Sequence, residues 1–210
     1  MPLDHPPAVG LFRLAEWLAD PAAWLPGDGG LPAELRAELA QSPVLRPLLN
    51  DWLTGQAGLV ALDGAATLLA EPHSQEEVAL AIALLTEPED RLLDVARFLG
   101  AALWADRLRR TLLRSDRDSL AARLGAEAMA FGLRRAPLLA RALMENPLAQ
   151  TATDPLAAGY ALSGALVARA HPWLFRLYRL RRPDLPDPIP LTDRQAQAAW
   201  AILALRGTLA

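Results

Sequence analysis

Alanine and leucine dominate this sequence, and proline and glycine interrupt the runs that they form. Alanine and leucine are strong helix formers, whereas alternating runs of β-branched and aromatic residues, which are typical of strands, are scarce. The chain has 18 prolines and 13 glycines, enough to divide it into many short helices. The sequence therefore predicts an all-α fold, a single compact domain of about nine to ten helices over residues 1–210.

Several positions carry the signals that begin a helix, either a capping box or a polar residue before a proline. In a capping box, a hydroxyl and an acidic or amide side chain satisfy two backbone N–H groups, and proline suits the first helical turn. The signals are Ser74 with Glu77, Thr86 with Glu89, Thr192 with Gln195, Asp154 before Pro155, and His171 before Pro172. They predict helices over 75–86, 155–168, 172–181 and 193–206, with a proline-rich connector at 183–190.

A related stretch occurs twice, as LGAALWADRLRR at 99–110 and LGAEAMAFGLRR at 124–135. We expect two antiparallel helices, separated by a turn in the polar segment 113–120. Gly100 and Gly125 would lie inside these helices, where glycine costs about 0.5–1 kcal/mol relative to alanine. Close helix packing would offset that cost, so the repeat predicts a central antiparallel pair of glycine-notched helices; a duplicated binding site is the alternative. Gly159 and Ser163 also favour close packing of the apolar helix over 155–168.

Charge divides the chain. Residues 1–88 have a net charge of −9, and residues 89–210 have a net charge of +6. We therefore expect an acidic N-terminal subregion of short helices and loops at 1–70 and a helical core at 74–210. The acidic and the basic part of the chain either attract each other within one fold or bind two different partners.

Composition limits the chemistry. The chain has no cysteine and no lysine, and its three histidines are far apart in sequence. Thiolate sites, lysine Schiff bases and the P-loop lysine are excluded, and metal binding has little support. The metalloprotease, nucleophile-elbow and dinucleotide-binding motifs are also absent. We expect no catalytic residue, no cofactor and no metal.

No segment reads as a membrane span or a secretory signal. The longest stretch without charge, residues 155–168, is shorter than the roughly 20 residues that cross a bilayer. The N-terminal residues contain an acid and no basic residue, unlike a signal peptide. These features predict a cytoplasmic protein.

The segment 169–182 combines arginine with aromatic residues and contains no acid. This composition is typical of protein interfaces, and it also suits nucleic acid or an anionic membrane. A surface helix with aromatics in the core and arginines in water has the same pattern; on a helix, Trp173, Leu177 and Leu180 share one face. The candidate partner-binding residues are Arg169, Arg176, Arg179, Arg181, Arg182, Trp173 and Tyr178.

Residues 92–139 resemble the central block of the SctK (YscK/PscK) family of type III secretion systems. The resemblance lies in a Leu-Gly helix ending in arginines, a polar turn, and a second Leu-Gly helix with a phenylalanine that ends in Ala-x-Leu-Leu. The matching residues are Leu99–Gly100, Arg109–Arg110, Ser115–Asp118, Leu124–Gly125, Phe131 and Ala136–Leu139. The opening LAEWLADPAAWLP at 14–26 is also similar to that family.

The resemblance implies a non-enzymatic adaptor of the injectisome sorting platform, at the cytoplasmic face of the inner membrane. Such proteins are thought to link the inner-membrane ring protein SctD to the pod protein SctQ, and through it to the stator and ATPase, SctL and SctN. The alternatives are a helical DNA-binding regulator that uses 169–182, which the net charge of −3 disfavours, and a helical enzyme with an apolar pocket near Gly159.

Overall fold

The computed structural model describes residues 7–24, 32–56, 75–111 and 113–205. Within these residues it has 15 helices and no strand, which confirms the all-α prediction. The described residues form more helices than the nine to ten expected, because the backbone leaves helical geometry within stretches whose sequence predicts one continuous helix. Trp104, Gly125 and Ala140 are three such breaks.

The described helices form two compact units. The first unit draws on residues 1–86 and 171–184, and the second on 87–170 and 185–210. The helices of the first unit are α1 (Pro7–Ala19), α2 (Pro21–Trp24), α3 (Ala33–Gln41), α4 (Arg46–Gln56), α6 (Gln75–Thr86) and α15 (Pro172–Arg181). Each unit is therefore discontinuous in sequence, and the single domain over 1–210 stays a prediction.

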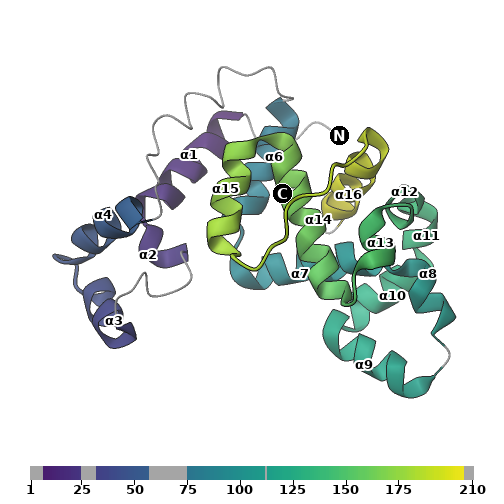
Figure 1. Cartoon of the computed structure of the whole chain (residues 1–210). Helices are drawn as coiled ribbons and strands as arrows, with labels where there is room; N and C mark the ends of the chain where they lie inside the picture. Colours follow the sequence, from purple (N-terminus) through teal and green to yellow (C-terminus); the bar gives the residue numbers. More distant parts are fainter. Residues whose placement is uncertain (1–6, 25–31, 57–74, 112, 206–210) are drawn as a thin grey trace. The chain divides into compact units, whose positions relative to one another are not determined.

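The second unit holds the remaining helices (Figure 1). They are α7 (Glu89–Leu103), α8 (Ala105–Arg110), α9 (Arg114–Leu124), α10 (Ala126–Arg134), α11 (Ala136–Leu139), α12 (Arg141–Met144), α13 (Pro147–Thr151), α14 (Pro155–Ala170) and α16 (Asp193–Leu205). The connector between α15 and α16 is non-helical through the predicted span 183–190.

The first unit buries its core around α6, which packs against α1 and α15. The inward residues of α6 include Ile82, Leu84 and Leu85, all essentially inaccessible to solvent. Nearer the N-terminus, α4 is tied to the junction of α1 and α2 by polar contacts. Asn50 accepts a hydrogen bond from the Ala22 N–H at 3.2 Å, and Arg46 forms an ion pair with Asp20.

The second unit is built on α7 and α14, which pack against each other. They run in opposite directions, because Gly100 lies against Pro155 and the earlier Ala96 lies against the later Gly159. Gly100 of α7 faces the Pro155 carbonyl, and Gly159 of α14 faces the Ala96 carbonyl. A Cβ at either glycine would overlap that backbone, so both positions require a residue without a side chain. An antiparallel glycine-notched pair exists, and its members are α7 and α14. The helix of the second repeat, α10, also packs on α7.

The two copies of the repeat have different structures. Gly125 separates α9 from α10 with φ +79°, a backbone conformation that favours glycine, and it does not lie inside a helix as predicted. The predicted turn at 113–120 is also wrong, because residues 114–120 are helical, whereas Thr111 and Leu113, which precede them, are not. The glycine of α10 that lies close to another helix is Gly132, where a Cβ would lie 2.9 Å from the carbonyl oxygen of Ala101 in α7.

Most of the predicted helix starts are confirmed. Thr192 and Gln195 form both bonds of a capping box, at 3.1 and 3.3 Å. Asp154 accepts from the Ala157 N–H at 2.9 Å, and His171 Nδ1 accepts from the Trp173 N–H at 3.1 Å.

The remaining two capping boxes have different outcomes. Ser74 lies outside the described residues, although α6 begins at Gln75 as expected. The box at Thr86 and Glu89 is wrong, because Pro88 precedes α7 without a side-chain cap. The Thr86 hydroxyl instead donates to the Ile82 carbonyl at 3.0 Å, within the preceding helix.

Candidate functional site

The arginine-rich segment forms α15, and its sequence explains both ends of the helix. His171 caps the N-terminus with its imidazole, and Pro172 occupies the first helical position. Arg179 and Arg181 lie in the last turn, where positive charge opposes the negative end of the helix dipole. Pro183, the first residue of the connector, follows two residues after the last residue of the helix, Arg181.

The helix has one buried face and one exposed face. The buried face contains Leu174, Leu177, Tyr178 and Arg181, which recur at three- and four-residue steps. Pro172, Arg176 and Arg179 recur at similar steps on the exposed face, and Trp173 is half-buried. The face predicted from Trp173, Leu177 and Leu180 is therefore rotated, with only Leu177 of the three buried.

Arg181 belongs to the interior of the first unit. Its residue is only 9% exposed, and its Nη1 donates a hydrogen bond of 2.8 Å to the carbonyl of Leu85. Leu85 lies in the last turn of α6, whose carbonyls have no partner within the helix. Arg181 thus caps the C-terminus of α6 across 96 residues of sequence.

Two further residues of the segment have restricted access to solvent. Tyr178 is completely buried. Arg182 is half-buried, and this burial lowers the pKa of its guanidinium below the ordinary value, while nearby Asp184 acts in the opposite direction.

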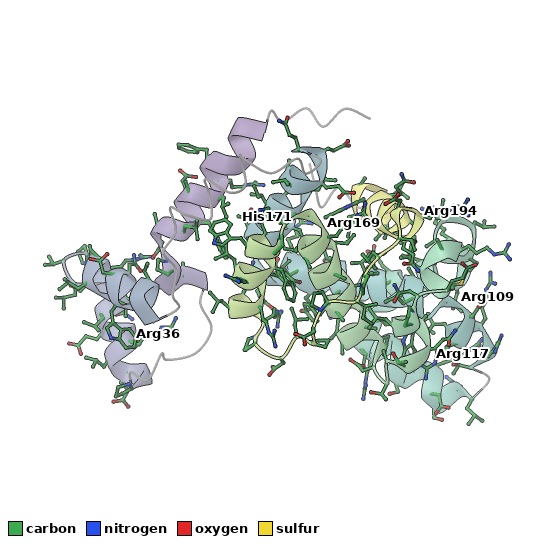
Figure 2. All side chains as sticks on the ribbon, turned by 45° about the horizontal axis from the view of Figure 1, so that its top comes forward. Arg36, Arg109, Arg117, Arg169, His171 and Arg194 are labelled. Carbon is green, nitrogen blue, oxygen red and sulfur yellow. The ribbon has the colours of Figure 1, made fainter. Side chains whose placement is uncertain are left out.

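Arg169 lies in the last turn of α14 and belongs to the second unit (Figure 2). Its guanidinium forms an ion pair of 2.8 Å with Asp193 and donates to the Leu191 carbonyl at 3.2 Å. These contacts hold the start of α16 against the end of α14. Arg169 and α15 thus fall in different units.

The seven candidate residues therefore reduce to a smaller surface within the first unit. We call it the α15 face and define it as Trp173, Arg176 and Arg179. Trp173 and Arg176 are three residues apart and adjacent on the helix. A half-buried indole beside exposed guanidinium groups offers apolar contact and charge-assisted hydrogen bonds to a carboxylate-bearing partner.

Two other kinds of site have no support from the described geometry. Within the described residues no group of three or more His, Asp or Glu side chains converges as a metal site would require. The space beside Gly159, where a cofactor or substrate pocket was an alternative, is filled by the Ala96 backbone.

Comparisons with protein-family models, curated proteins and solved structures gave no match. In the part of the chain that the structure describes, no helix combines the length and the apolar character that crossing a bilayer demands.

Proposed function

We propose that this chain is a non-enzymatic helical adaptor of a bacterial type III secretion sorting platform, similar to the SctK family. It would link the inner-membrane ring protein SctD to the pod protein SctQ, and through SctQ to SctL and SctN. It would act at the cytoplasmic face of the inner membrane. The secretion role rests on the resemblance over residues 92–139, and the binding role rests on the α15 face.

The residues that carry the resemblance support a scaffold role for that block. Leu99, Leu124 and Ala136 are fully buried in the second unit. Phe131 packs on Phe98 with ring centroids 5.4 Å apart. Because these apolar side chains serve packing, contacts with partners must come from exposed residues, either within this block or outside it.

The observation that carries the binding proposal is the exposure of Arg176 and Arg179 beside Trp173. Arginine and tryptophan are enriched among the few residues that dominate binding energy, and truncation of such a residue commonly costs about 2 kcal/mol or more. Exposed guanidinium groups also accelerate encounter with an acidic partner, and this effect weakens as salt increases.

The test uses the purified full chain and biolayer interferometry against two partners, the cytoplasmic domain of SctD and full-length SctQ. The test variant is Arg176→Glu with Arg179→Glu. The control is Arg134→Glu with Arg135→Glu, which makes the same change in charge at two exposed arginines of the second unit. We expect the test variant to weaken binding to one partner by roughly 30-fold or more and the control to change it less than about twofold.

The outcomes separate the two parts of the proposal. If the wild-type chain binds neither protein, the adaptor role is wrong. If it binds and the test variant binds equally well, the α15 face is wrong while the adaptor role stands. Tight, strongly salt-dependent binding to duplex DNA would favour the regulator instead. Only two of the five arginines in the segment that it requires, Arg176 and Arg179, are exposed.

A further inference from the structure

The second unit contains a groove that the sequence analysis did not indicate. It lies between α8 and α9 and the segment that precedes α14, and it encloses about 520 Å³. Three arginines line it, Arg107 and Arg110 from α8 and Arg123 from α9, together with one carboxylate, Asp116. We call this the α8–α9 groove.

Arg107 is held in place by two contacts. Its guanidinium carbon lies 3.8 Å above the centre of the Trp104 ring, and its Nη1 donates to the Ala152 carbonyl at 2.7 Å. Trp104 is itself buried, so the platform beneath the cation is fixed. A guanidinium has five N–H donors, and these contacts leave others to bind an anion. Little side-chain entropy remains to be lost when such a group binds a ligand.

The other charged groups of the groove differ in how they are held. Arg123 forms an ion pair of 2.8 Å with Asp154, which neutralises part of its charge. Arg110 is exposed, and it lies three residues from Arg107, so their side chains are neighbours on α8. Asp116 is also exposed, and its carboxylate would repel an anion in the groove.

We propose that the α8–α9 groove binds an acidic peptide segment of a partner protein. The donors are side chains from two helices, Arg107 and Arg110 on α8 and Arg123 on α9, which suits several carboxylates better than one compact phosphate. Leu120 and Pro155 also line the groove and offer apolar contact for a side chain between those carboxylates. This proposal does not depend on the secretion role or on the α15 face.

The probe is a short fluorescein-labelled peptide of glutamate and leucine, measured by fluorescence anisotropy with the full chain. The matched peptide has glutamine in place of every glutamate. We expect the glutamate peptide to bind, its affinity to fall with added salt, and the glutamine peptide to bind at least about tenfold more weakly.

Three variants assign the binding to the groove. Arg110→Ala should weaken it roughly fivefold, because one exposed charge-assisted contact is lost. Asp116→Asn should strengthen peptide binding roughly two- to threefold, because the substitution removes the repelling negative charge and keeps the size of the side chain. Arg134→Ala, an exposed arginine of the same unit outside the groove lining, should leave it unchanged. Arg107 is not replaced, because its loss would also free the Ala152 carbonyl.

The Asp116→Asn result decides between a binding role and a structural one, since damage to the fold does not tighten binding. Equal binding of the two peptides, or an Asp116→Asn variant that binds no tighter than wild type, would overturn the proposal. Displacement of the peptide by inorganic phosphate, well beyond the displacement caused by chloride at the same ionic strength, would also overturn it and identify a small-anion site.

Discussion

Replacing Gly159 with alanine tests the close approach of α7 and α14, on which the second unit is built. The added Cβ would overlap the Ala96 carbonyl oxygen and would lie 2.6 Å from the Ala96 carbonyl carbon and 2.9 Å from its Cα. Non-bonded carbons rest at about 3.5–4.0 Å. The atoms in the way belong to backbone, so no side-chain rotation relieves the overlap.

The magnitude follows from two opposing terms. Alanine improves helix propensity by about 0.5–1 kcal/mol. Against this, the two helices must separate by about 1 Å, which weakens the dispersion contacts along their interface. Overpacking of a core commonly costs about 1–3 kcal/mol, and a backbone overlap belongs at the upper end. We expect a net destabilisation of about 2 kcal/mol.

The assay is urea unfolding followed by far-UV circular dichroism. With a slope of about 2 kcal/mol/M, the midpoint should fall by about 1 M. The control is Gly55→Ala in α4, where an added Cβ meets nothing within 4 Å. That variant should be unchanged or more stable, by up to about 1 kcal/mol. If Gly159→Ala raised the midpoint as the control does, the α7–α14 contact described here would be refuted.

Two further substitutions test contacts that are local in space. Arg181→Met keeps the aliphatic stem but leaves the Leu85 carbonyl without its charged donor. We expect the free energy of unfolding, measured by urea titration, to fall by about 1–2 kcal/mol. An unchanged midpoint would show that this bond does not stabilise the first unit. Thr192→Ala removes the hydroxyl that accepts from the Gln195 N–H. We expect the free energy of unfolding to fall by about 1 kcal/mol in this variant and to stay close to wild type in Thr192→Ser. Equal stabilities of the two variants would contradict the capping role.

Predictions from the sequence were correct where a side chain and the backbone groups that it binds are neighbours in the chain. His171 before Pro172 and Thr192 with Gln195 specify helix starts because each side chain reaches only backbone groups two or three residues away. Asn146 before Pro147 caps α13 in the same manner, and the same rule would have found it. Thr86 misled because its hydroxyl has an alternative partner within reach and donates to the carbonyl of Ile82 in the preceding turn.

Sequence reasoning failed where a distant element decides the outcome. Gly100 and Gly125 stand in the same Leu-Gly-Ala context, yet one lies against α14 and the other ends α9. Only the presence of α14 distinguishes them. The burial of Arg181 was visible in principle, since it continues the three- and four-residue spacing of Leu174, Leu177 and Tyr178. The grouping of Arg107 with Arg123 was not visible, because it depends on how α8 meets α9.

The bond from Arg181 to Leu85 also bears on how the polypeptide is made. The ribosome synthesises α6 long before α15. The apolar face of α6 that α15 covers therefore stays uncovered while roughly half of the protein is still to be translated. The second unit waits as well, because α16 packs on α7 and α12. Neither unit can be produced by cutting the gene once. We expect a fragment that stops at residue 170 to expose the inner side of α6 and to aggregate or be degraded in the cell.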